Sequence, residues 1–166
     1  MSLLVVDDPS DRPAWIRETI ALLGDRIRAD RARLVARVAA ASDGDLVRGE
    51  ADDWGLGQVA THLLIVERGV LSIALRLARG ERVDSGTGQP RPAAGGVSRA
   101  RVAALVEKAE RDLVSFLAEF PAEPHTTVVA RHPFYGQMNC FGWLLTPLVH
   151  YAAHLQALER GTKSAL

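Results

Sequence analysis

The sequence predicts an all-α protein, a four-helix bundle with a long crossover connection. Four stretches of the 166-residue chain carry apolar residues at helical spacing, and no stretch carries a convincing strand period. Two connections between these stretches are long, which favours an arrangement other than simple up-down-up-down. A chain of this length can bury one sizeable core, so we expect a single bundle domain over residues 1–166.

The first helix is predicted from Ala14 to Ala40, with Asp11 as its cap and Pro13 in the first turn. Its apolar stripe consists of Trp15, Ile16, Ile20, Leu23, Ile27, Leu34, Val35 and Val38. Charged residues occupy the other sides, and we interpret them as a solvated face: Asp25, Arg26, Arg28, Asp30, Arg31, Arg33 and Arg37.

The second and third helices have clear ends. The second is predicted from Leu56 to Arg79 and is closed by Gly80, a residue typical of helix C-termini. The third begins after Ser98, a good N-cap, and ends before Pro121. Residues 80–98, between these two helices, are rich in Gly, Pro and Ser, which predicts a mobile connection.

The fourth helix is predicted from Asn139 to Gly161 and contains Pro147, which removes one backbone hydrogen bond and frees the carbonyl of Trp143. Either the helix is kinked there, or Thr146 is a cap and Pro147 a true start. We favour one kinked helix. Residues 121–138, which precede it, are irregular and are expected to contain a short extended piece.

The composition is that of a globular protein, with 48% hydrophobic and 24% charged residues. The net charge is zero, so the totals predict no nucleic-acid or membrane partner. One cysteine, Cys140, cannot form an intramolecular disulfide, and the N-terminus lacks a basic secretory region. The longest apolar stretch, residues 140–153, is too short to span a bilayer. We therefore expect a cytoplasmic protein.

Two histidines in the last helix, His150 and His154, are four residues apart and so share one face. That spacing lets two imidazoles meet one divalent cation. His62 lies on the core-facing stripe of another long helix and is the natural third ligand. Three histidines leave a coordination position for water or substrate, as catalytic metal sites do. The ordinary alternative is three hydrogen-bonded core histidines.

Other candidates carry weaker patterns. His125 and His132 lie in irregular sequence, where a surface or loop-fixing role is the usual one. Cys140 is expected to be a buried structural thiol. Glu67, on the helix of His62, could orient an imidazole, but we expect it to be exposed to solvent. No glycine-rich phosphate loop, GxSxG elbow or CxxC pair is present, and no catalytic residue beyond the metal ligands can be named.

Two segments in order, DDWGLGQVATHLLIVERG and HPFYGQMNCFGWLLTPLVHYAAHLQALER, resemble the DinB/YfiT-like superfamily of bacterial metal-dependent enzymes. That family has a helical W…HL…E segment followed by HPxxG…W…HxxxH near the C-terminus. The resemblance implies a four-helix bundle, usually a homodimer, whose His62, His150 and His154 bind nickel, zinc or a similar divalent ion. Family members of known activity use bacillithiol or mycothiol as S-transferases or thiol-dependent isomerases.

These observations lead to one functional expectation with two alternatives. We expect a divalent-metal-dependent enzyme whose co-substrates are a low-molecular-weight thiol and a small electrophile, the latter held beneath the 80–98 connection. One alternative is a hydrolase that uses metal-activated water. The other is a non-enzymatic, dimeric binding protein of the stress response. Three imidazoles suit zinc, nickel, copper or iron, so the residues do not choose the metal.

Overall fold

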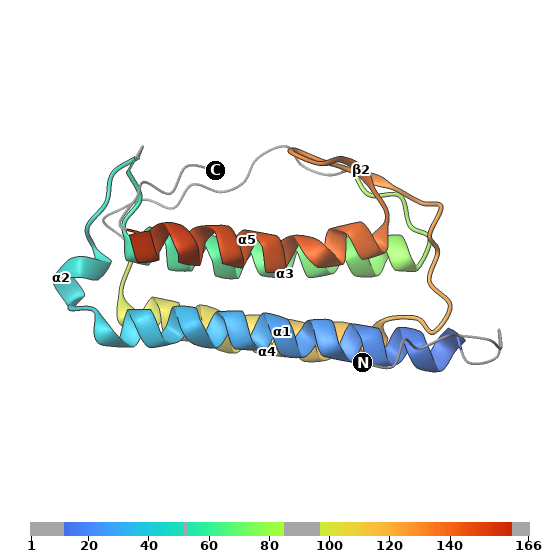
Figure 1. Cartoon of the computed structure of the whole chain (residues 1–166), viewed down its shortest axis with the longest axis horizontal. Coiled ribbons are helices and arrows are strands. Elements are labelled where there is room, and N and C mark those ends of the chain that lie inside the picture. Colours follow the sequence, from blue (N-terminus) through green and yellow to red (C-terminus); the bar gives the residue numbers. More distant parts are fainter. Residues whose placement is uncertain (1–11, 52, 85–96, 161–166) are drawn as a thin grey trace.

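The computed structural model describes residues 12–51, 53–84 and 97–160, and these form the predicted four-helix bundle (Figure 1). Its long helices are α1 (Arg12–Ala40), α3 (Leu56–Ala78), α4 (Arg99–Glu119) and α5 (Cys140–Arg160). The smaller elements are the short helix α2 (Asp43–Leu46) and the strands β1 (Ala130–His132) and β2 (Gly136–Met138). The described helix ends lie within two residues of the predicted ones. The expected cap Asp11, Gly161 and most of the 80–98 connection lie outside the described residues.

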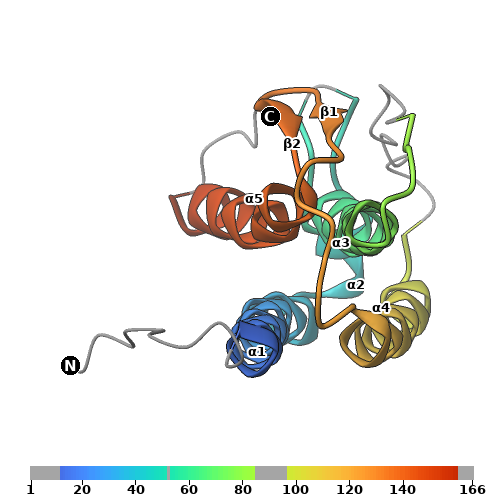
Figure 2. The ribbon, with the colours of Figure 1, turned by 90° about the vertical axis from the view of Figure 1, so that its right-hand side faces the viewer.

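The order of the helices around the bundle follows from their contacts and is visible end-on in Figure 2. Helix α3 packs against α5 and α4, while α1 packs mainly against the same two helices from the opposite corner. Helices α3 and α4 are parallel, since Arg68 pairs with Asp112 and Arg79 with Glu119. Parallel neighbours cannot be joined by a tight turn: the end of α3 and the start of α4 lie at opposite ends of the bundle, as the predicted crossover requires.

Burial on α1 differs from the prediction on both sides of its stripe. Trp15 and Val35, assigned to the core, are 42% and 37% exposed. Asp30 and Arg31, assigned to the solvated face, are buried at 1% and 4% exposure. The buried apolar positions on α1 form a seam too narrow for Trp15 and Val35, which lie beside it. Arg31 lies in register with that seam, and its charge is met by carboxylates from other helices.

The apolar core is divided into two clusters. One contains Ile27 and Val70, and the other contains Leu34 and Leu64. The boundary therefore falls at Arg31 on α1 and near Glu67 on α3. Among the described helices, α3 alone is long and apolar enough to cross a membrane. However, 61% of its most apolar 18-residue stretch is buried within the bundle. Its apolar character is thus explained by its central position in the core.

Close backbone packing fixes the start of α3. Ser42 caps α2, with its hydroxyl accepting the Asp45 N–H at 3.1 Å, and α2 then presents the Leu46 carbonyl to α3. A Cβ placed on Gly57 would come within 2.1 Å of that carbonyl oxygen. Only glycine therefore fits at this point, five residues before His62.

Replacing Gly57 by alanine is expected to lower the free energy of unfolding by about 1–3 kcal/mol, because rigid backbone must move to admit the methyl group. Gly69 on the same helix is the matched control, since a Cβ there meets nothing within 4 Å. Gly69→Ala should raise stability by about 0.5–1 kcal/mol through helix propensity. Urea unfolding of the two variants measures both effects. Equal changes in unfolding free energy would contradict the close contact between Gly57 and the Leu46 carbonyl.

Helix α5 continues through Pro147, which confirms one helix and excludes a new start at Thr146. Pro147 has no N–H to donate to the Trp143 carbonyl. That carbonyl accepts a hydrogen bond from the Thr146 hydroxyl at 2.7 Å instead. A side-chain donor thus replaces the missing backbone donor. The turn of α5 that carries His150 remains continuous with the rest of the helix.

The segment between α4 and α5 is attached to the end of the bundle. The His125 N–H donates to the Ala78 carbonyl at 2.9 Å, and the indole N–H of Trp143 donates to the Ala130 carbonyl at 3.2 Å. Cys140 is fully buried, as expected. The extended piece predicted within residues 121–138 is the antiparallel β1–β2 hairpin, in which Arg131 lies opposite Gln137. These contacts hold the hairpin beside α5.

Candidate metal centre

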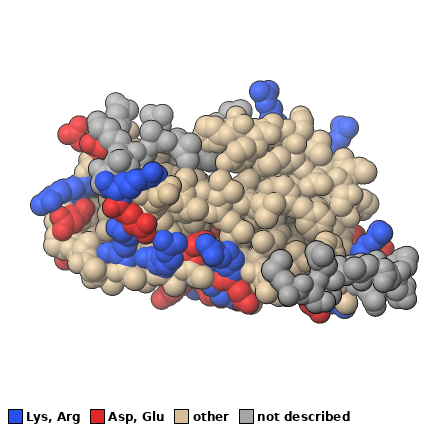
Figure 3. Space-filling model, in the orientation of Figure 1, with Lys and Arg blue, Asp and Glu red and all other residues tan. Residues whose placement is uncertain are grey.

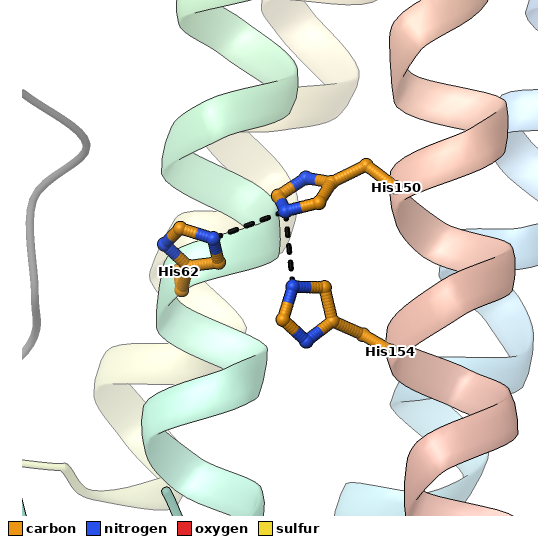
Figure 4. Close-up of side chains that lie close together, drawn as sticks. All are labelled: His62, His150 and His154. Carbon is orange, nitrogen blue, oxygen red and sulfur yellow. Dashed lines mark hydrogen bonds between the residues drawn. The ribbon is translucent and has the colours of Figure 1, made fainter. Parts of the chain in front are cut away.

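Three imidazoles from two antiparallel helices converge inside the bundle (Figure 4). His62 lies near the start of α3, and His150 and His154 lie in the second half of α5. The Nε2 atom of His150 is 3.1 Å from Nε2 of His62 and 3.0 Å from Nε2 of His154. One ligand atom from each residue lies within 4.8 Å of the others, so the three could hold one metal ion.

The convergence fits a cation better than a set of hydrogen bonds. A neutral imidazole nitrogen carries either one proton or one lone pair, so His150 Nε2 cannot bond fully to both neighbouring nitrogens. A cation can accept all three lone pairs at once. Two nitrogens at about 2.0–2.1 Å from a tetrahedral zinc ion lie roughly 3.3 Å apart, close to the spacings found here. Two of the three nitrogen pairs, His62–His150 and His150–His154, thus already have a spacing near that of zinc ligands.

Burial favours the neutral form of His150 and His154. His62 and His154 are each 1% exposed, and His150 is half-buried. Desolvation, followed by repulsion from His154, His62 and His132, lowers the pKa of His150 to about 3. Desolvation and His62 likewise lower the pKa of His154 to about 4. Near neutral pH both rings therefore present lone pairs, which is the state that metal ligands require.

Residues just before α3 and in its first turn restrain the His62 ring. The indole of Trp54 packs edge-on against it, with ring centroids 4.8 Å apart, and donates its N–H to the Ala51 carbonyl at 3.1 Å. Gln58 is buried and secures the same loop, because its Oε1 accepts the Gly55 N–H at 3.0 Å. The tryptophan of the W…HL…E motif thus helps to set the orientation of the histidine.

The expectation that Glu67 is exposed is wrong, because its side chain is 1% exposed. Its carboxylate accepts hydrogen bonds from the Tyr151 hydroxyl at 2.7 Å and from Arg31 at 2.9 Å. Burial raises the pKa of Glu67 to about 7, although Arg31 and Tyr151 oppose the shift. Arg31 also pairs with Glu110, so the network joins all four long helices next to the histidines. The spacing of Glu67 from the buried Leu63 and Leu71 was the available sequence signal.

His132 is not on the surface, since it is 5% exposed. Its ring stacks on Tyr135 at a centroid distance of 4.8 Å and meets Trp143 edge-on at 5.0 Å. Its Nδ1 accepts the Phe134 N–H at 3.2 Å, which is a loop-fixing contact. His132 does not join the three-histidine group.

A mainly apolar pocket of about 170 Å³ opens beside His150. Val66 and Val70 of α3, Val149 and His150 of α5, and the tip of the hairpin line it. The outer surface over α5 shows almost no charged side chains, whereas both signs gather over α2 and along α1 (Figure 3). A larger, more open groove between α3 and α4 includes Arg68 and Asp112, but no histidine lines it. The surface that leads to the site is therefore apolar, and the imidazole nitrogens are the groups that can donate electron pairs to a metal ion.

The fold and this centre define a class of protein, a four-helix bundle with three convergent histidines from two of its helices. The DinB superfamily model matches residues 26–158, and the chain therefore belongs to the DinB superfamily. It is also similar to TT2238, a four-helix bundle protein, at 26% identity over 85% of this chain and 98% of that one, with a TM-score of 0.65. No curated protein matches the chain. The comparisons thus give a family and a fold, without a reaction.

Proposed function

We propose that this chain is a divalent-metal-dependent enzyme that joins a low-molecular-weight thiol to a small electrophile, as an S-transferase or a thiol-dependent isomerase. The observation that carries the proposal is the convergence of three imidazoles, one of which, His150, also lines an apolar pocket. Membership of the DinB superfamily agrees with it. Three protein ligands leave a coordination position for an exogenous group, as catalytic sites do.

The residues of the site have three roles: they bind the metal ion, orient a ligand histidine and exclude water. His62, His150 and His154 would hold the ion, with Trp54 restraining His62. When bound, a divalent ion supplies the acidity that converts a coordinated thiol into a thiolate at neutral pH. The valines of the pocket exclude water from the reacting sulfur, which favours attack on an electrophile over hydrolysis.

The surroundings of the site complete the proposal. We take nickel or zinc as the ion and bacillithiol or mycothiol as the thiol, in a cytoplasmic homodimer without nucleic-acid or membrane partners. The histidine set suits both metals, and the neutral net charge supports the absence of polyanionic partners. The thiols and the homodimer rest on the resemblance of the two sequence motifs to the DinB/YfiT-like family.

A turnover assay tests the proposed reaction. The zinc- or nickel-loaded protein is mixed with bacillithiol or mycothiol and monochlorobimane, whose carbon–chlorine bond breaks as a carbon–sulfur bond forms and chloride leaves, the thiol proton passing to solvent. We expect a rate about tenfold or more above the protein-free reaction, with His154→Ala at background. Product formed equally well without thiol would support the hydrolase alternative. No acceleration with either thiol would contradict the S-transferase.

A further inference from the structure

The hairpin contributes an imidazole, that of His132, to a mainly apolar pocket. The rings of Phe134 and Tyr135 are 60% and 55% exposed and form its outer rim. Thr146 also lines it, but its hydroxyl proton already serves the Trp143 carbonyl. An engineered apolar cavity of about 150 Å³ holds one benzene molecule. This pocket, at about 170 Å³, accordingly has room for a single small ring.

The tautomer of His132 follows from its backbone contact. Its Nδ1 accepts the Phe134 N–H, so in the neutral ring the proton resides on Nε2. In the part of the chain that the structure describes, Thr61 Oγ1 is the one fully enclosed side-chain polar atom without a hydrogen-bond partner. Nε2 of His132, for which no partner is found among the same residues, therefore reaches open space. His132 lines this pocket, and we assign its Nε2–H to it.

We propose that the pocket binds a small, ring-sized apolar molecule with one hydrogen-bond acceptor, and that the acceptor receives the Nε2–H of His132. The substrate class is then an aromatic or cyclic electrophile bearing a carbonyl, nitro or similar oxygen. This inference rests on the proposed function, because it assigns the pocket to the electrophile of that reaction. His132 is a substrate-positioning residue that lines the same pocket as His150.

Two probes of nearly equal shape test the assignment by binding alone. 4-Fluoroacetophenone carries a carbonyl acceptor, whereas 1-ethyl-4-fluorobenzene carries none, and fluorine NMR follows the binding of each. The measurements use zinc-loaded and metal-free protein, so they are independent of turnover. His132→Asn removes the Nε2 donor while its amide oxygen can still accept the Phe134 N–H.

We expect His132→Asn to lower the ketone-to-hydrocarbon affinity ratio by about three- to tenfold, the contribution of one hydrogen bond, and to leave hydrocarbon binding within about twofold. Tyr135→Phe, which removes the other donor at the rim, should keep the wild-type ratio. Val149→Trp should fill the pocket and abolish binding of both probes. Leu145→Trp, one turn away at a position that is also exposed, should leave the binding of both probes unchanged.

Several results would overturn the inference. If the ketone-to-hydrocarbon affinity ratio stayed unchanged in His132→Asn, or fell in Tyr135→Phe, His132 would not be the donor. Binding of both probes to Val149→Trp at wild-type affinity would place them elsewhere. These outcomes differ from failure of the proposed reaction, since a protein that binds both probes as expected but gives no thiol-dependent turnover would keep the pocket assignment and lose the enzyme class.

Discussion

Replacement of His154 by alanine is expected to abolish stoichiometric metal binding. The wild-type protein, reloaded with zinc or nickel and freed of excess ion, should hold one ion per chain. Removing one of three convergent imidazoles leaves two ligands and a cavity, and the affinity should fall more than about 100-fold. Elemental analysis and competition with a chromogenic chelator measure the loss. His62→Ala and His150→Ala should behave alike.

His125→Ala provides the control for this series. It is also a histidine-to-alanine change, but His125 lies in the α4–α5 connection and does not belong to the three-histidine group. Its metal content should remain that of the wild type. Substoichiometric metal in the reloaded wild type, or full metal content in His62→Ala, would be incompatible with a centre built from these three residues.

Truncating Glu67 should produce the largest loss of stability. Glu67→Ala removes the buried carboxylate that meets Arg31 at 2.9 Å, and leaves a 4%-exposed guanidinium without its buried partner. Breaking a buried pair in this way costs about 3–5 kcal/mol of unfolding free energy. The measurement is urea unfolding at pH 8, above the pKa of about 7 that burial gives Glu67, where its carboxylate is ionised.

Glu110→Ala is the matched control, because Glu110 pairs with the same arginine but its side chain is 41% exposed. Its loss should cost no more than about 1 kcal/mol, as for other solvent-screened pairs. The double variant Arg31→Met/Glu67→Leu should recover most of the stability lost in Glu67→Ala, since no charge is then buried. Equal losses in Glu67→Ala and Glu110→Ala would refute the assignment of the buried pair.

The sequence predicted those features of the site that depend on the periodicity of a single helix. Spacing within α5 placed His150 and His154 on one face, and the core stripe of α3 pointed His62 inward. Their meeting required only that the two helices be antiparallel neighbours. Arg31 was assigned to the solvated face with the other charges of its helix, and Glu67 was expected in solvent, because the sequence does not show that the two are partners. The partners are 36 residues apart, and the helix packing pairs them.

The pocket could not be derived from sequence for a similar reason. His132 becomes a pocket residue only because the hairpin folds back over α5, where Trp143 holds it through the Ala130 carbonyl. Its ring orientation depends on the Phe134 N–H, a contact within a turn that has no strand or helix period. Periodicity identifies the faces of regular elements, whereas the placement of an irregular segment depends on tertiary contacts.

The separation of His62 from His150 along the chain has a consequence for folding. The two residues are 88 positions apart, so an ion shared between them would act as a cross-link that closes a long chain loop. Such a closure removes conformational freedom from the unfolded ensemble, and binding to the assembled site alone adds its free energy to that of the fold. Metal supply in the cell would then govern the lifetime of the protein as well as its chemistry.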